Sequence, residues 1–179
     1  MIEIYLARGK YHAEAMTEKV FSNIHGKPAP SVMRDAFGKP VFADDSSRHL
    51  SLSHSGDYTI LALADCPVGV DLQRLRMKTD PLAAAKRFFT PAEAEIIEKA
   101  PPDQRTRCFL DIWAKKEAAV KAAGTGFDIP PSSFSVLSDQ LTLKGLTLRF
   151  IAIDAPAGYT ARLAASADNP SVEVSTIIG

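Results

Sequence analysis

The stretch from Phe109 to Gly124 constrains the fold most, because it places charged side chains inside an apolar helical pattern. Its apolar residues recur at helical spacing, alanines fill the positions between them, and Gly124 is a typical helix-terminating residue. Trp113, Glu117 and Lys121 are four residues apart, so they share one face of the predicted helix. A glutamate and a lysine four residues apart on a helix, such as Glu117 and Lys121, usually form a solvent-exposed salt bridge worth about 0.3–0.5 kcal/mol. Other motifs in the chain favour a chemical role for this face instead.

The composition is typical of a folded protein without a strong overall charge. Hydrophobic residues make up 46% and charged residues 23% of the 179 residues, and 21 Lys and Arg balance 21 Asp and Glu. A general nucleic-acid binder is therefore not expected, and an anion site must come from a local cluster. Cys66 and Cys108 form no zinc-binding pattern, and no targeting segment or membrane-length apolar run is present. We expect a cytoplasmic protein without membrane partners.

Alternating apolar residues and turn signals predict the elements of the first half of the chain. The expected elements are a strand over 2–7, a helix over 11–24, a turn at 38–40, a hairpin of strands 49–55 and 58–64, and a strand over 68–73. Ser53 and His54 lie near the hairpin tip. In the last strand, Asp71 and Gln73 point to the same face.

The second half begins with two helices that have clear start signals. Asp80 precedes Pro81 as an N-cap, and the run from Thr90 to Glu93 reads as a capping box that opens a helix to about Lys99. After the long helix we expect strands over 134–137, 141–153, 159–165 and 172–177. We place a lobe boundary after Lys78, giving lobes 1–78 and 79–179. A weak similarity between 57–64 and 158–165 fits either an internal duplication or two ordinary strands.

Several short motifs occur in one order along the chain. They are Gly38-Lys39-Pro40, Leu52 to Gly56, Val68 to Asp71, Arg87 to Thr90 with Glu93, and Trp113-x-x-Lys116-Glu117-Ala118-x-x-Lys121. The series, which spans about 37–134, resembles the 4′-phosphopantetheinyl transferases of the larger, surfactin-synthetase-activating type. The resemblance implies an α+β fold of two similar lobes related by a pseudo-twofold axis, with the active site between them. It also implies Mg²⁺-dependent transfer of 4′-phosphopantetheine from coenzyme A to a serine of an apo acyl or peptidyl carrier protein, by a monomer.

The resemblance also implies a set of site residues. Asp71 and Glu117, with Gln73, are the expected metal ligands, and carboxylates with substrate phosphate suit Mg²⁺. Coenzyme A would contact Lys39, Pro40, Ser53, His54, Asp71, Lys116 and Lys121. The expected catalytic residues are Glu117, Glu93 and Lys121.

Alternatives remain open at several of these positions. Glu93 could deprotonate the carrier serine or serve only the capping box. A hydrolase dyad of Ser53 and His54 is disfavoured, because adjacent strand residues point to opposite faces. Gln73 stands where the family often has an acidic residue, and the segment before Gly38 is short, with only Arg34 as a substitute phosphate contact.

These departures motivate a second hypothesis, a catalytically silent module that binds coenzyme A or a carrier protein. The basic cluster of Arg74, Arg76 and Lys78 could dock an acidic carrier protein or could simply be a charged surface.

Overall fold

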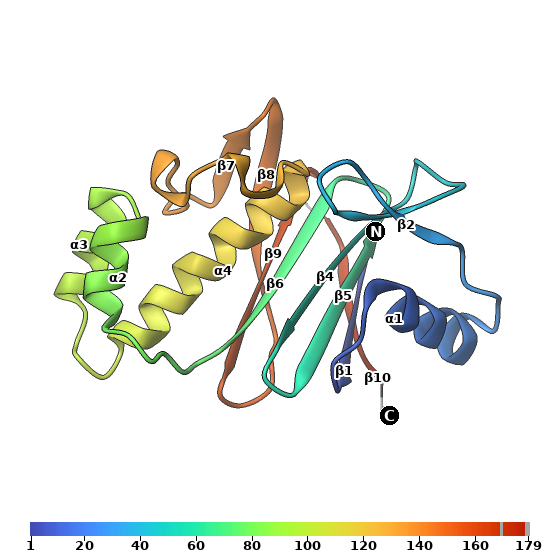
Figure 1. Ribbon diagram of the computed structural model, residues 1–179, viewed down its shortest axis with the longest axis horizontal. Helices are drawn as coiled ribbons and strands as arrows, with labels where there is room; N and C mark the ends of the chain where they lie inside the picture. Colours follow the sequence, from blue (N-terminus) through green and yellow to red (C-terminus); the bar gives the residue numbers. More distant parts are fainter. Residues whose placement is uncertain (169, 178–179) are drawn as a thin grey trace.

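The computed structural model describes residues 1–168 and 170–177 and has a mixed α/β architecture. Two four-stranded sheets lie at its centre, with helix α1 on one side and helices α2, α3 and α4 on the other (Figure 1). The bounds of these helices are Ala13–Val20 for α1, Pro81–Phe88 for α2, Pro91–Lys99 for α3 and Arg105–Ala123 for α4. The predicted mixture of helices and sheets is therefore confirmed.

The first sheet has the strand order β10-β1-β5-β4. Its strands are β10 Val172–Ile177, β1 Ile2–Arg8, β5 Tyr58–Ala64 and β4 His49–Ser55. β4 and β5 form the predicted hairpin, β5 is antiparallel to β1, and β10 pairs with β1 in parallel. A separate small hairpin, β2 Val32–Arg34 with β3 Pro40–Phe42, carries the turn that contains Lys39.

The second sheet has the order β6-β9-β8-β7, and all its neighbours are antiparallel. Its strands are β6 Val68–Arg74, β9 Tyr159–Ala165, β8 Leu146–Ile153 and β7 Gln140–Leu143. Helix α4 packs across β6 and β9, and α2 and α3 pack against α4 (Figure 1). The predicted metal-site strand and the long helix are thus direct neighbours.

The two sheets pack on each other through their inner faces. This central core contains Ile2, Ile4, Leu6, Ile60, Ala62, Ala64, Val68, Val70, Leu72, Ile153, Ala161, Leu163 and Ala165. Alternate residues of β1 and β5 point outward instead, where α1 covers them with Met16 and Val20. Helices α2 to α4 bury an apolar face against the outer side of the second sheet. The molecule therefore has four layers, in the order α1, first sheet, second sheet, α4.

Local sequence determines the starts of α2 and α3 and the end of α4, as predicted. The Asp80 side chain accepts a hydrogen bond from the Ala83 amide at 2.7 Å, and Pro81 follows as the first helical residue. Thr90 and Glu93 form the complete capping box. Gly124 has a φ of 65° directly after α4, a conformation that glycine adopts without steric cost.

Three predicted elements differ from the structure. No strand forms over 134–137, because the Val136 amide donates to Glu93 Oε1 at 2.8 Å and its carbonyl accepts from Lys115, so side chains take its backbone hydrogen bonds. The strand expected over 141–153 is the β7–β8 hairpin, since Lys144 and Gly145 have φ of 50° and 80° and form a turn. The helix expected over 11–24 is α1 followed by a π-helix, Phe21–His25.

β6 pairs with β9, and β10 pairs with β1. The lobe boundary that we expected after Lys78 lies C-terminal to β6, and the division into lobes stays a prediction.

Among the helices of the described residues, none has the length and apolar character that a membrane crossing requires.

Candidate active site

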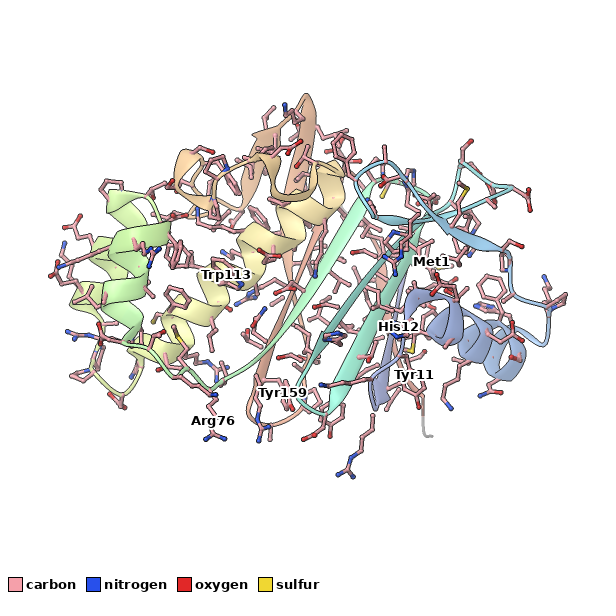
Figure 2. The ribbon with its side chains drawn as sticks, viewed as in Figure 1. Met1, Tyr11, His12, Arg76, Trp113 and Tyr159 are labelled. Atoms are coloured by element: carbon pink, nitrogen blue, oxygen red, sulfur yellow. The ribbon has the colours of Figure 1, made fainter. Side chains whose placement is uncertain are left out.

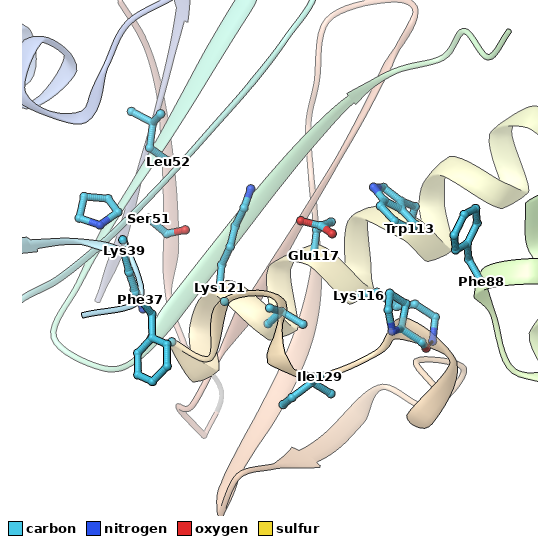
Figure 3. Close-up of a pocket in the computed structure, with 16 residues that line it drawn as sticks. Phe37, Lys39, Ser51, Leu52, Phe88, Trp113, Lys116, Glu117, Lys121 and Ile129 are labelled. Atoms are coloured by element: carbon cyan, nitrogen blue, oxygen red, sulfur yellow. Dashed lines mark hydrogen bonds between the residues drawn. The ribbon is translucent and has the colours of Figure 1, made fainter. Parts of the chain in front are cut away.

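A pocket of about 420 Å³ lies between the β2–β3 turn, β4 and α4 (Figure 3). The predicted site residues that line it are Lys39, Pro40, Lys116, Glu117 and Lys121. The predicted site residues outside its lining are Ser53, His54, Asp71, Gln73 and Glu93. Most of the remaining wall is apolar, with Phe37, Leu52, Phe88, Trp113, Val120, Ile129 and Pro131. Figure 3 shows Glu117 between Trp113 and Lys121 along α4.

Asp71 is the centre of a hydrogen-bond network beside this pocket and is only 3% exposed. Its Oδ1 accepts from Ser53 Oγ at 2.9 Å and from Lys121 Nζ at 2.7 Å. Its Oδ2 accepts from Gln73 Nε2 at 2.7 Å. One carboxylate therefore joins β4, β6 and α4, and the expected grouping of Asp71 with Lys121 and Gln73 is present.

α4 approaches β6 closely because residue 69 is glycine. A Cβ at this position would collide with the Ala118 carbonyl oxygen and lie 2.5 Å from the Ala122 amide nitrogen. The helix presents small alanines to the strand here, and both Ala118 and Ala122 are buried. This close approach places the face of β6 that carries Asp71 within reach of Lys121.

Glu117 is the second carboxylate of the site and points into the pocket (Figure 3). Burial raises its pKa above the ordinary value, the negative charge of Asp71 raises it further, and Lys121 lowers it in part. Within residues 1–168 and 170–177, no hydrogen-bond donor is directed at its carboxylate. Its oxygens are therefore free to bind a cation or to accept a proton.

The residues fit a hard divalent cation such as Mg²⁺. The described part of the chain contains no group of three or more His, Cys, Asp or Glu side chains that could hold a metal ion. The donor set instead consists of two carboxylates, from Asp71 and Glu117, with the amide of Gln73 beside them. Mg²⁺ is commonly held by one or two carboxylates, with substrate phosphate and water completing the shell.

Glu93 and Lys116 form a buried ion pair, so neither side chain offers an unpaired charge to the pocket. Their side chains are 0% and 1% exposed, and Lys116 Nζ lies 2.8 Å from Glu93 Oε2. Lys116 also donates to the carbonyls of Pro131 and Phe134, at 2.7 Å and 2.5 Å. Glu93 accepts from the amides of Thr90 and Val136. The capping-box interpretation of Glu93 is therefore confirmed. The Lys116 ammonium is already engaged by these three oxygens, and its expected phosphate contact stays a prediction.

Ser53 and His54 have different surroundings, as expected for adjacent strand residues. Ser53 is buried and donates to Asp71, whereas His54 is exposed. The hydroxyl of Ser53 also accepts from the Leu72 amide at 3.2 Å. A Ser53–His54 dyad is therefore absent, and a direct contact of the Ser53 hydroxyl with coenzyme A is not favoured by its existing bonds.

Lys39 reaches from the β2–β3 turn to the C-terminal end of α4. Its Nζ lies 3.5 Å from the Val68 carbonyl, and its aliphatic chain passes close to Gly124. Burial lowers its pKa, and nearby Asp35 opposes this shift. Pro40 follows at the start of β3. Arg34 is exposed and donates to the Gly38 carbonyl at 2.9 Å, so it supports this same turn.

With this geometry known, comparison with known proteins identifies the family. The 4'-phosphopantetheinyl transferase superfamily matches residues 67–167, more than half of the chain. The chain belongs to this superfamily. The matched segment runs from just before β6 to just after β9, so it contains Asp71, Glu117 and Lys121.

Individual 4′-phosphopantetheinyl transferases are similar over part of their length. The chain is 33% identical to the 4′-phosphopantetheinyl transferase psf-1 of Bacillus pumilus, over 77% of this chain and 60% of that protein. It is 36% identical to Sfp of Bacillus subtilis (strain 168), over 58% of this chain and 46% of Sfp. It is 38% identical to another 4′-phosphopantetheinyl transferase of Bacillus subtilis, over 56% and 44%. The chain thus spans about half the length of the relatives that it matches.

One cluster of polar side chains beside the site was not predicted from the sequence. Asp111 of α4 accepts from Thr160 Oγ1 at 3.0 Å and from Arg162 Nε at 2.7 Å. Arg162 is paired with Asp71 across the β6–β9 ladder, so the group adjoins the site on the same sheet face. The carboxylate inside the helical pattern at Asp111 was the available signal, but nothing in the sequence indicated its strand partners.

Proposed function

We propose that this chain transfers 4′-phosphopantetheine from coenzyme A to a serine of an apo acyl or peptidyl carrier protein, in a reaction that requires Mg²⁺. The observation that carries the proposal is the pairing of Asp71 on β6 with Glu117 on α4 beside the pocket, with Lys121 bound to Asp71. Burial and the nearby charge of Asp71 make ionisation of Glu117 costly, and a divalent cation bound there would relieve that cost. Family membership and the names of the relatives support the same reaction.

Asp71 and Glu117 would hold Mg²⁺, and the amide of Gln73 would orient Asp71 or contribute through water. When bound, Mg²⁺ would neutralise charge on the diphosphate of coenzyme A and on the departing adenosine 3′,5′-bisphosphate. Lys121 supplies a second positive charge at the same carboxylate and is 28% exposed, so it can reach a substrate phosphate. Glu93 has no part in this scheme as a base, since it is buried and bonded on both oxygens.

The pocket suits the remainder of coenzyme A. We propose that Lys39 and Pro40 contact the nucleotide end, with His54 at the exposed rim of β4. The apolar wall around Trp113 suits an uncharged pantetheine chain better than a second phosphate group. We further infer two α+β lobes with pseudo-twofold symmetry. The two weakly similar segments form β5 and β9. Each of these is an interior strand of its own sheet, which supports this symmetry.

The protein partner would be an acidic surface beside the target serine of the carrier protein. Arg74, Arg76 and Lys78 are all exposed, and Figure 2 shows Arg76 at the outer edge of the molecule. Such a cluster would raise the association rate and weaken with added salt. We propose that the chain acts in the cytoplasm as a monomer.

A second candidate is a silent module that binds coenzyme A or a carrier protein without transfer. Gln73 favours it, because its amide nitrogen is bound to Asp71 where an additional carboxylate would strengthen a metal site.

Intact-mass analysis of apo carrier proteins incubated with this chain and coenzyme A separates the two functions. A mass gain of one phosphopantetheine that disappears with chelator, and in Glu117→Ala, would support transfer. Glu95→Ala is the matched control, since that glutamate is exposed on α3 and is not part of the pocket lining. No gain on any carrier protein, with coenzyme A still bound in calorimetry, would support the silent module. Normal transfer by Glu117→Ala would contradict the metal assignment.

A further inference from the structure

A row of three serines connects one edge strand of each sheet, where β4 of the first sheet lies beside β6 of the second. β4 is the edge strand of the first sheet and β6 is the edge strand of the second, and they lie side by side (Figure 1). The hydroxyls of Ser51, Ser53 and Ser55 accept hydrogen bonds from alternate amides of β6. The donors are Val70 at 3.0 Å, Leu72 at 3.2 Å and Arg74 at 2.9 Å. Side-chain oxygens thus occupy the places that backbone carbonyls take in a continuous sheet.

The middle serine differs from its two neighbours in where its own proton points. A hydroxyl can accept and donate at the same time. Ser53 donates to Asp71 Oδ1 at 2.9 Å while it accepts from Leu72. Among the described residues, Ser51 and Ser55 make the amide contact without a carboxylate partner. Ser53 is therefore the only member of this row that connects the sheet junction to the candidate metal site.

We propose that Ser53 is a positioning residue that sets the orientation of Asp71, and that it does not bind coenzyme A through its hydroxyl. This inference rests on the proposed function, because it assigns a role within the same site. Ser53 is 6% exposed and its side chain is short, so the bond holds Asp71 in one place relative to β4. Lys121, the other donor to Oδ1, has a long and flexible side chain that is 28% exposed. The carboxylate would turn toward this ammonium if Ser53 were lost.

The junction also explains how the first sheet can influence the metal site. Asp71 lies on the second sheet, yet one of its donors comes from the first. A shift of β4 along β6 would move the Ser53 hydroxyl and with it the favoured position of the Asp71 carboxylate. Groups that orient metal ligands typically change metal affinity or activity about 10–100-fold when removed.

The test compares Ser53→Ala with Ser55→Ala, which removes an equivalent amide contact and leaves Asp71 untouched. Mn²⁺ serves as the probe, and its free concentration is measured by electron paramagnetic resonance with coenzyme A present and no carrier protein. We expect Ser53→Ala to weaken Mn²⁺ binding about tenfold, whereas Ser55→Ala binds as the wild type does. Coenzyme A affinity without metal should be equal in both variants. Equal Mn²⁺ affinity in the two variants would overturn the inference, as would a loss of metal-free coenzyme A binding in Ser53→Ala alone.

Two further variants decide the matter if Ser53→Ala does not fold. Ser53→Thr keeps the O–H donor, and Ser53→Cys has a similar size but a weak donor. We expect the threonine variant to bind Mn²⁺ at least severalfold more tightly than the cysteine variant, and equal affinities would contradict the proposal. Absence of Mn²⁺ binding by the wild type would instead count against the proposed function, so the two failures are distinguishable.

Discussion

The two carboxylates of the candidate site have opposite surroundings. Asp71 accepts bonds from Ser53, Lys121 and Gln73, so its negative charge is well compensated. Glu117 is partly buried and faces the charge of Asp71, and among residues 1–168 and 170–177 it is Lys121 that offsets this charge. A side chain whose charge is costly in the folded protein reduces stability, and such positions are often kept for function.

Glu117→Gln should therefore stabilise the metal-free protein at neutral pH. Because burial and Asp71 raise the pKa of Glu117, the folded state holds this proton more tightly than the unfolded state does. Wild-type stability then falls as pH rises from 4.5, the ordinary pKa, through the folded pKa, whereas glutamine does not titrate. The melting temperature of the variant should exceed that of the wild type increasingly over this range, as followed by circular dichroism with chelator present.

Glu98→Gln on α3 is the control for this experiment. Lys86 lowers the pKa of that exposed carboxyl, so its replacement should change the melting temperature little, and downward. A Glu117→Gln variant that is less stable than the wild type at pH 8 would contradict the interpretation.

Lys116→Met should destabilise the protein strongly. It would leave the Glu93 carboxylate buried without its ionic partner, a change that typically costs about 3–5 kcal/mol. Urea unfolding measures this loss, and Lys99→Met is the matched control, since Lys99 pairs with Glu95 at an exposed site. If Lys116 were a phosphate ligand instead, the variant would keep its stability and lose coenzyme A affinity.

Neighbouring residues in a motif need not share a role, and this limits prediction at the residue scale. Lys116 and Glu117 are adjacent in the motif, but successive helical residues differ by about 100° in direction. Lys116 therefore meets the carbonyls of Pro131 and Phe134, whereas Glu117 enters the pocket. The partners lie 15 and 18 residues further along the chain, in a segment that was expected to be partly a strand. Sequence patterns do not specify such pairings.

At the element scale, β6 and α4 were predicted well because each carries strong local signals. Alternation defines β6, and helical spacing with a terminal glycine defines the end of α4. The predicted helix start, Phe109, is later than the observed Arg105, since no capping side chain marks that end. The serine row between β4 and β6 was not predicted, because it depends on how two sheets meet and not on either strand alone.

Gly69→Ala should separate these two elements. The added Cβ meets backbone atoms of Ala118 and Ala122, which cannot rotate away as a side chain could. Overpacking of this kind typically costs about 1–3 kcal/mol, and the shift of α4 should reduce the proposed transfer activity by moving Lys121 from Asp71. Chemical denaturation and the carrier-protein assay measure the two effects.

Gly145→Asn is a suitable control for this substitution. Its Cβ would meet nothing within 4 Å, and asparagine tolerates a φ of 80° better than most residues. A Gly69→Ala protein with wild-type stability would show that α4 and β6 can separate without cost.

At the scale of the whole molecule, the central core belongs to both sheets. Ile4 and Leu6 of β1 contact the same apolar layer as Val70 of β6 and Leu163 of β9. Composition and strand patterns predicted a mixed fold, but not that the sheets would pack face to face. That packing depends on strand pairs distant in sequence, such as β1 with β10 and β6 with β9. Two sheets that share such a core are expected to unfold together.

Met16→Ala tests this cooperativity from the far side of the molecule. Met16 is fully buried between α1 and the first sheet, and its truncation should cost about 2–5 kcal/mol. Trp113, the only tryptophan of the chain, lies on α4 beyond the second sheet and reports on that side alone (Figure 2). In a cooperative molecule, the urea midpoint followed by Trp113 fluorescence falls together with the midpoint followed by far-ultraviolet circular dichroism. An unchanged Trp113 midpoint would mean that the two sides unfold independently. In that case the site between β4, β6 and α4 could open without loss of either sheet.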